Sequence, residues 1–177
     1  MQAPQFPDPH FGQSPPPYQA PPPSGFRVPL TTEQARVPLE AFGRPVAFDA
    51  DGQSPIFVGS SIFPNSVHPC KIAPHLSPPC RVPYGGEEHE HRGRYDVLPF
   101  DQAVMEWVPT AHGQIPHGRR PVEGGYEEGG GKLYHALAIV HGVRVPGKTA
   151  EHLHGCNVAF GRSEHIIREN YEILCWK

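Results

Sequence analysis

The sequence has few of the features that mark membrane proteins, nucleic-acid-binding proteins or zinc proteins. No stretch approaches the roughly 18 consecutive apolar residues that a membrane span requires. Lys and Arg number 15 against 18 Asp and Glu, a net charge of −3, so the basic surface that binds nucleic acid is not expected. None of the four cysteines forms a Cys-x-x-Cys pair, which removes the usual zinc and thioredoxin motifs.

Motifs for catalysis and for secretion are also missing. No Gly-x-Ser-x-Gly or comparable nucleophile motif occurs, so neither enzymatic activity nor a cofactor is expected. Residues 1–24 contain no Lys or Arg, and no apolar segment follows them that could act as a secretory signal. The sequence therefore predicts a cytoplasmic protein or one exported by a non-classical route.

Proline is abundant at the N-terminus, where aliphatic residues are scarce. Nine of the 24 prolines lie within residues 1–24, a composition that cannot bury enough apolar surface to fold alone. We predict an extended proline-rich arm over residues 1–25 and a linker over residues 26–35. Pro15, Pro16 and Tyr18 fit the Pro-Pro-x-Tyr ligand of WW domains, which docks as a polyproline II helix. The alternative is a solvated spacer.

The rest of the chain contains an internal repeat. VPYGGEEHEHRGRYDVL (residues 82–98) aligns with VAFGRSEHIIRENYEIL (residues 158–174) at a constant offset of 76 residues. Upstream segments match in the same order, at an offset of 76 or 77 residues. These matches indicate a tandem duplication over residues 36–101 and 105–177.

The repeat also bears on whether Glu-Glu-His-Glu-His, residues 87–91, is a metal site. Only Glu88 and His89 recur in the second copy, which favours a scaffold pair that hydrogen-bonds a turn. We interpret Glu87, Glu90 and His91 as a solvated loop. A second candidate, His152 with His154, has no partner cluster at metal-ligand spacing, so no metal is expected.

Short strands separated by Gly and Pro turns are the predicted secondary structure. The best helical candidate is a single turn at Thr31–Ala35. Because neither copy alone would bury enough surface, we expect an all-β fold in which two antiparallel repeats share one core about a pseudo-twofold axis. The predicted strands are Ile56–Ser61, Lys71–Ala73, Arg81–Tyr84, Arg94–Pro99, Leu133–Val140, Lys148–Ala150, Asn157–Phe160 and Asn170–Trp176.

Several motifs in both copies resemble the DM-nine repeat. In the second copy these are Met105–Pro109, Gly125-Tyr126, Pro146-Gly147-Lys148 and Tyr171–Leu174. The first copy matches through Phe48–Gly52, Pro69-Cys70-Lys71 and Tyr95–Leu98, but has Val37-Pro38-Leu39 in place of the opening Trp-Val-Pro. The resemblance covers about residues 36–177. It implies an all-β tandem repeat protein of a family that includes mannose-binding lectins of bivalve molluscs and the repeats of natterin-like proteins.

The resemblance also implies a sugar site in each copy. Lectins of this family use an acid after the aromatic of the Gly-Tyr-Asp motif and the Lys of the Pro-Gly-Lys motif. Here these residues are Asp49 with Lys71, and Glu127 with Lys148. The alternative is that each pair is an ordinary exposed ion pair. The resemblance therefore favours a non-enzymatic, multivalent mannose-type lectin that forms a homo-oligomer.

A second functional hypothesis comes from the proline-rich arm. If the arm docks onto a neighbouring copy of the chain, a head-to-tail contact that does not close would produce a filament. The protein would then be a structural, self-assembling protein. The two hypotheses are compatible, because an oligomer also multiplies weak sugar sites.

Overall fold

The computed structural model describes residues 22–177 and shows an all-β protein, as the sequence predicts. Fifteen strands are accompanied by two short 3-10 helices, η1 (Leu39–Ala41) and η2 (Glu151–Leu153). The first half contains β1 (Val28–Thr31), β2 (Ala47–Phe48), β3 (Pro55–Ile62), β4 (Val67–Ile72), β5 (Cys80–Tyr84), β6 (Glu87–Glu90) and β7 (Arg94–Val97). The second half contains β8 (Met105–Thr110), β9 (Arg120–Pro121), β10 (Glu123–Tyr126), β11 (Lys132–Val140), β12 (Val143–Ala150), β13 (Gly155–Phe160), β14 (Ser163–Ile167) and β15 (Tyr171–Trp176).

All eight predicted strands are present, and two of them begin well before the predicted residue. β4 begins four residues before the predicted Lys71, and β12 begins five residues before the predicted Lys148. Each contains a proline, Pro69 or Pro146, and proline inside a strand argues against that assignment because it has no N–H to donate. The sheet nevertheless holds both prolines in register, opposite Ser60 and Leu137.

Glu87, Glu90 and His91 were predicted to form a solvated loop. Glu87 and Glu90 are exposed, but they belong to the strand β6, and His91 is buried. β6 pairs with β5 across a tight turn in which Gly85 and Gly86 both have positive φ, at 59° and 86°. This is the backbone that a two-residue hairpin turn requires. The His91 ring is buried, and its Nε2 donates a hydrogen bond of 2.7 Å to the Arg94 carbonyl oxygen.

Two N-terminal predictions are also wrong. The helical turn expected at Thr31–Ala35 is the end of β1 followed by a turn, and η1 lies further along the chain. β1 falls within residues 26–35, which were predicted to be a linker. The arm over residues 1–25 lies mostly outside the described residues, as does the WW-ligand motif of Pro15, Pro16 and Tyr18.

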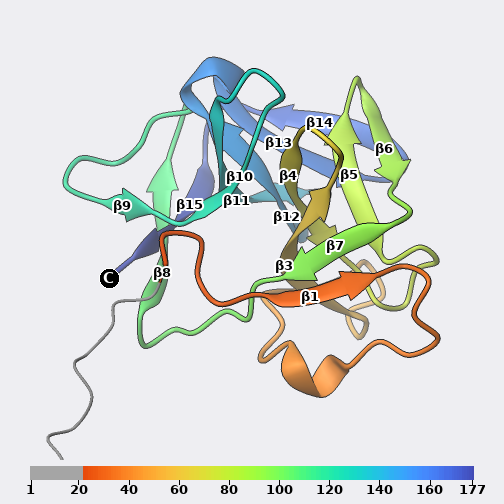
Figure 1. Cartoon of the computed structure of the whole chain (residues 1–177). Helices are drawn as coiled ribbons and strands as arrows, with labels where there is room; N and C mark the ends of the chain where they lie inside the picture. The colour runs from red at the N-terminus through yellow and green to blue at the C-terminus, as the bar shows by residue number, and fades with distance from the viewer. Residues whose placement is uncertain (1–21) are drawn as a thin grey trace, which may run out of the picture.

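The order of the strands is the same from either end of the sheet. It runs β1-β7-β3-β4-β5-β6-β14-β13-β12-β11-β15-β8, so each strand of the first half has a counterpart in the second. In Figure 1, β6 and β14 lie side by side where the two halves meet. β10 pairs with both β11 and β4, which closes β4-β5-β6-β14-β13-β12-β11-β10 into an antiparallel ring.

In the strand order, β1 takes the place in the first half that β8 takes in the second. Val28 pairs with Val97 on β7, just as Val108 pairs with Ile173 on β15. The counterpart of the opening Trp-Val-Pro is therefore Arg27-Val28-Pro29, and Val37-Pro38-Leu39 lies at η1 instead.

The hydrophobic core is shared between the halves. One cluster joins Ala47 and Ile56 to residues of β11, β12 and β13, and another joins Val58 and Leu98 to the packed side chains of Leu174 and Trp176. A third cluster belongs to the first half and contains Phe42, Tyr95 and the buried thiols of Cys70 and Cys80. All four cysteines are buried and free.

The segment just before β1 ties the two halves together. Arg27 forms an ion pair of 2.9 Å with Asp96 and donates to Ser60 Oγ at 3.1 Å, both in the first half. It also donates to the Glu123 carbonyl oxygen at 2.9 Å and to His135 Nε2 at 2.8 Å, both in the second half. One guanidinium therefore joins four groups from both halves.

Candidate functional site

The two lysines predicted as sugar ligands occupy equivalent places in the sheet. Lys71 lies on β4 and Lys148 on β12, its counterpart in the strand order. Their exposed fractions are only 2% and 3%. Burial lowers the pKa of both ammonium groups, although neighbouring carboxylates act in the opposite direction. Because both lysines are buried, they cannot form the solvent-exposed ion pairs that the alternative interpretation expects.

The first site is built around Lys71 and a glutamate of the scaffold pair. Lys71 Nζ lies 3.5 Å from Glu88 Oε1, and Arg81 Nη1 lies 3.6 Å from the same oxygen. On another side, Lys71 Nζ lies 5.5 Å from the centroid of the Phe160 ring, a cation–π distance. Phe160 belongs to β13, so the second half completes the first site.

The second site is the counterpart around Lys148. Its Nζ donates a hydrogen bond of 3.1 Å to His68 Nδ1 and lies 5.4 Å from the centroid of the Tyr84 ring. Burial and the nearby Lys148 charge lower the pKa of His68 from 6.5 to about 4, so its ring is neutral at pH 7. A neutral ring that accepts at Nδ1 carries its proton on Nε2, which lies 3.1 Å from Ser66 Oγ.

The scaffold glutamates bond to turns of the opposite half. Glu88 Oε2 accepts a hydrogen bond of 3.4 Å from the Arg162 backbone N–H, and Glu164 Oε1 accepts one of 3.1 Å from the Gly86 N–H. Glu88 and Glu164 thus each bond a turn, as predicted, but the turn that each one bonds belongs to the other half. His89 bonds a carbonyl of its own half, that of Tyr84, at 2.9 Å.

The predicted acids lie near the lysines but are paired with histidines. Asp49 Oδ2 is 2.8 Å from His75 Nε2, and Glu127 Oε1 is 3.3 Å from His152 Nε2. The negative charge of each acid counteracts the lowered pKa of its lysine. Within residues 22–177, however, neither acid forms an ion pair of 4.0 Å or less with its lysine.

The histidine partners were missed by the sequence interpretation, although a signal for them exists. Lys71-Ile-Ala-Pro-His75 and Lys148-Thr-Ala-Glu-His152 share the pattern Lys-x-Ala-x-His. Each histidine therefore stands at the same distance from its lysine in both halves. In both halves the structure brings it to the acid.

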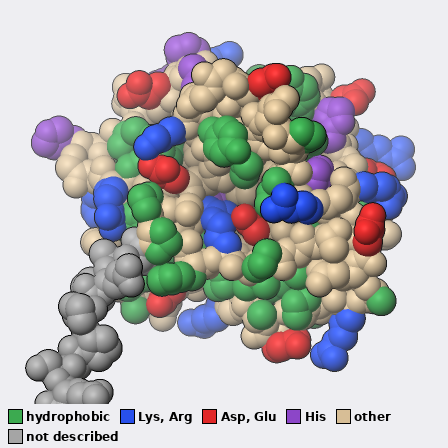
Figure 2. Space-filling model, in the orientation of Figure 1, with side chains coloured by type: hydrophobic (Ala, Val, Ile, Leu, Met, Phe, Trp, Pro, Cys, Tyr) green, Lys and Arg blue, Asp and Glu red, His purple; other side chains and the backbone are tan. Residues whose placement is uncertain are grey.

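A cavity of about 870 Å³ opens beside the second site. Its lining includes Glu127 of the second half and four aromatic residues of the first half, Phe63, His68, Tyr84 and His91. The volume falls in the range of roughly 300–1,000 Å³ that is typical of small-molecule sites. On the face shown in Figure 2, acidic and basic side chains are interspersed. Among residues 22–177, no three His, Cys, Asp or Glu side chains converge in the manner of metal ligands.

The neutral state of His68 predicts a loss of stability in acid. In the unfolded chain a histidine binds its proton near pH 6.5, whereas His68 in the folded chain binds it only near pH 4. The unfolded chain therefore binds the extra proton between these values, and the free energy of unfolding should fall as the pH falls through this window. Urea unfolding at pH 7 and pH 4.5 should show a smaller loss for His68→Gln than for the wild type.

The control for this experiment is His117→Gln, which changes an exposed histidine on the loop between β8 and β9. It should keep the wild-type loss of stability. An equal loss in wild type and His68→Gln would contradict the assignment of a buried, neutral His68.

The structure defines an all-β protein with a closed antiparallel sheet and a lysine at equivalent positions in each half. The family model of the DM9 (DM-nine) repeat matches residues 49–167. The chain therefore belongs to the DM9 repeat family.

Among solved structures, the chain is similar to the nematode sperm cell motility protein MFP2B, with a TM-score of 0.63 and 18% identity. The match covers 93% of this chain and 49% of that one, so the chain spans about half the length of its structural neighbour. This likeness concerns the fold. No curated protein sequence matches the chain.

Proposed function

We propose that the protein is a non-enzymatic, mannose-type carbohydrate-binding protein with one sugar site in each half. The observation that carries the proposal is the pair of equivalent sites, each with a lysine, a histidine-bound acid and an aromatic ring from the other half. Tandem duplication is part of the proposal and is supported by the matching strand order from both ends of the sheet.

The chemistry of these sites suits a sugar. A carboxylate accepts hydrogen bonds from two neighbouring hydroxyls, and an ammonium donates to a third oxygen. Asp49 and Glu127 remain partly exposed and would meet the sugar first, with Tyr84 or Phe160 available to the apolar face of the ring. Each charge-assisted bond contributes about 1.5–3 kcal/mol, so a single site would bind weakly.

Two sites and an oligomer would strengthen the binding of a branched glycan. Linked sites raise the overall affinity by about 10²–10⁴ without new contacts, provided that both can be engaged together. We therefore propose homo-oligomerisation as part of the lectin function. Assembly through the N-terminal arm, in a structural role, is the second proposed function. The similarity of the fold to that of a nematode sperm cell motility protein is the reason to propose a structural role beside the lectin role.

The test uses the acids, because removal of a buried lysine would also disturb folding. In Asp49→Asn with Glu127→Gln, the loss of one charge-assisted bond per site should weaken mannan binding at least about tenfold. Mannan-affinity chromatography and calorimetric titration with mannose oligosaccharides would measure it. The control, Glu40→Gln, changes an exposed acid on η1 and should bind as the wild type does.

The same variants separate the two proposed functions. Under the lectin proposal, the double variant loses mannan binding and keeps the wild-type size-exclusion profile. Full mannan binding by the double variant would contradict the assigned sugar sites. If the wild type itself does not bind mannan yet elutes as an oligomer, the structural role is favoured instead.

A further inference from the structure

Four aromatic rings surround the cavity beside the second site, and they form what we call the aromatic box: Phe63, His68, Tyr84 and His91. The Phe63 centroid lies 4.7 Å from that of His91 and 5.6 Å from that of His68, and His68 lies 6.1 Å from Tyr84. All three pairs are edge-to-face, with interplanar angles of 62°, 85° and 74°. The faces of these rings therefore point in different directions around the cavity.

Two of the rings are open to a ligand. Tyr84 is 59% exposed and Phe63 is 37% exposed, although both are large and apolar. Phe63 stands in the turn between β3 and β4, which is closed by a 2.9 Å hydrogen bond from its N–H to the Ser66 carbonyl oxygen. Ser66 Oγ is in turn 3.1 Å from His68 Nε2, so the turn that carries Phe63 is anchored to a second ring of the box.

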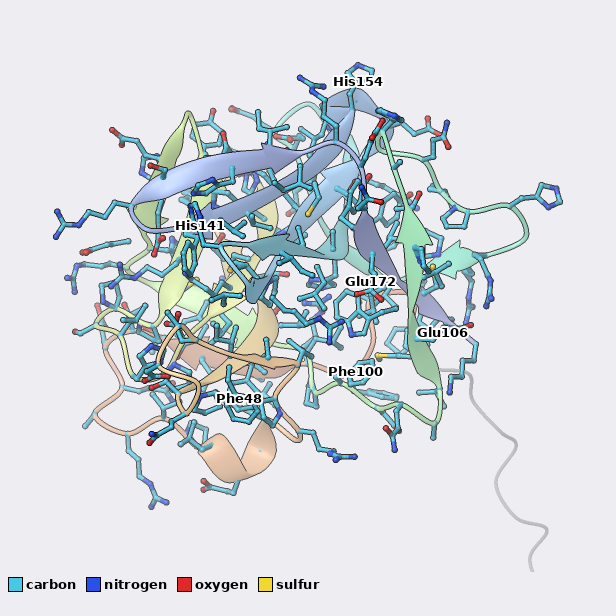
Figure 3. All side chains as sticks on the ribbon, turned by 180° about the vertical axis from the view of Figure 1, so that it is seen from behind. Phe48, Phe100, Glu106, His141, His154 and Glu172 are labelled. Carbon is cyan, nitrogen blue, oxygen red and sulfur yellow. The ribbon has the colours of Figure 1, made fainter. Side chains whose placement is uncertain are left out.

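The box belongs to one half of the molecule. In the first half, four residues, Phe63–Ser66, separate β3 from β4, whereas in the second half only His141 and Gly142 separate β11 from β12. His141 marks this shorter turn in Figure 3. The longer turn supplies Phe63, so the box is an addition to the lysine site and not part of its repeated pattern.

Carboxylates line the cavity next to the aromatic rings. Glu90, Glu127 and Glu128 line the cavity together with Arg92 and Arg94, and Arg92 lies 3.8 Å from Glu90. With that pair set aside, Glu127 and Glu128 remain, together with the Arg94 guanidinium and the nearby Lys148 ammonium. His68 contributes a ring face and no charge, because its pKa is about 4. The Lys148 ammonium lies 5.4 Å from the Tyr84 ring centroid, which shows that this ring accommodates a cation.

We propose that the aromatic box, with Glu127 and Glu128 at its rim, binds a quaternary or methylated ammonium group. Aromatic faces attract such cations within about 6 Å of the ring centroid, and a bulky, weakly hydrated cation fills an aromatic cavity better than a metal ion does. The site shares Glu127 with the proposed sugar site but does not depend on sugar binding. The occupant is a small molecule or side chain that carries a trimethylammonium-like head.

The test compares choline with its uncharged isostere, 3,3-dimethyl-1-butanol, in NMR titrations of the full-length protein at constant ionic strength. Choline should shift the signals of the box saturably, and the isostere should bind at least about tenfold more weakly. Phe63→Leu keeps an apolar side chain but removes the ring face, and should weaken choline binding about tenfold. Glu127→Gln should weaken it severalfold. The matched control is Phe48→Leu, which changes an exposed phenylalanine on β2 (Figure 3) and should leave it unchanged.

Three results would overturn the proposal: no saturable choline binding, equal binding of choline and the isostere, or unchanged choline binding by Phe63→Leu. Because Phe63 is partly exposed in a turn, Phe63→Leu should fold, and its urea unfolding would verify this. Mannan binding is measured on the same variants. Choline binding without mannan binding would contradict only the lectin proposal, and mannan binding without choline binding would contradict only the aromatic box.

Discussion

Gly125→Ala is expected to destabilise the protein by about 3 kcal/mol, because it obstructs the closure of the sheet. β10 reaches β4 through a single register pair, Tyr126 with Val67, and Gly125 lies directly beside that contact. A Cβ atom at Gly125 would overlap the Val67 carbonyl oxygen and come within 2.6 Å of its carbonyl carbon. Backbone cannot move aside as a flexible side chain can, so β10 would have to separate from β4.

Urea unfolding followed by fluorescence would measure this loss, with Gly129→Ala as the matched control. Gly129 lies in the turn that follows β10, and a Cβ atom there would have nothing within 4 Å. Gly129→Ala should change the free energy of unfolding by less than about 0.5 kcal/mol. If Gly125→Ala unfolds at the wild-type urea concentration, β10 does not close the ring in the way described.

Arg27→Leu should cost about 3 kcal/mol, the lower end of the loss expected when one partner of a buried ion pair is removed, because the Arg27–Asp96 pair is mostly but not fully buried. The variant would leave Asp96 without its ion-pair partner. Burial already raises the pKa of this carboxyl despite the adjacent guanidinium, which shows how costly its charge is. Arg27→Leu would also remove the donor to His135 Nε2. The His135 ring has no other hydrogen bond in the described structure.

The comparison variant is Arg36→Leu. Arg36 forms an ion pair of 3.8 Å with Glu40, but both side chains are largely exposed. Pairs of this kind contribute about 0–1 kcal/mol, so the variant should unfold close to the wild type in the same urea experiment. A similar, small effect of both substitutions would show that Arg27 does not join the two halves energetically.

The strands were predicted from local sequence patterns, so the strands that have such a pattern were found. Segments such as Leu133–Val140 have the β-branched and apolar residues of buried strands, and Gly and Pro turns separate them. β6 could not be found this way, because Glu87–Glu90 contains no apolar residue. It is a strand because β5 and the neighbouring β14 provide its backbone partners, and sheet context outweighs intrinsic preference.

The residues of the candidate site came from the family resemblance, and their contacts could not be derived from it. The resemblance pointed to Lys71 and Lys148, and the structure places both at equivalent positions on β4 and β12. Their aromatic neighbours, Phe160 and Tyr84, lie in the opposite half. An alignment of one copy with the other shows which residues correspond but not which ones touch, so the exchange between halves could not be derived from it.

The exchanged glutamate bonds have a consequence for how such a molecule could arise. Glu88 holds a turn of the second half, and Glu164 holds the matching turn of the first half. Reciprocal contacts of this form are the signature of a symmetric dimer interface, here contained in one polypeptide. Under the proposed duplication, a shorter ancestor with one copy would have made the same contacts between two separate chains. Fusion then makes the pairing independent of protein concentration. Each copy can also change in sequence as long as the reciprocal bonds are kept, and the longer turn at Phe63 is such a change.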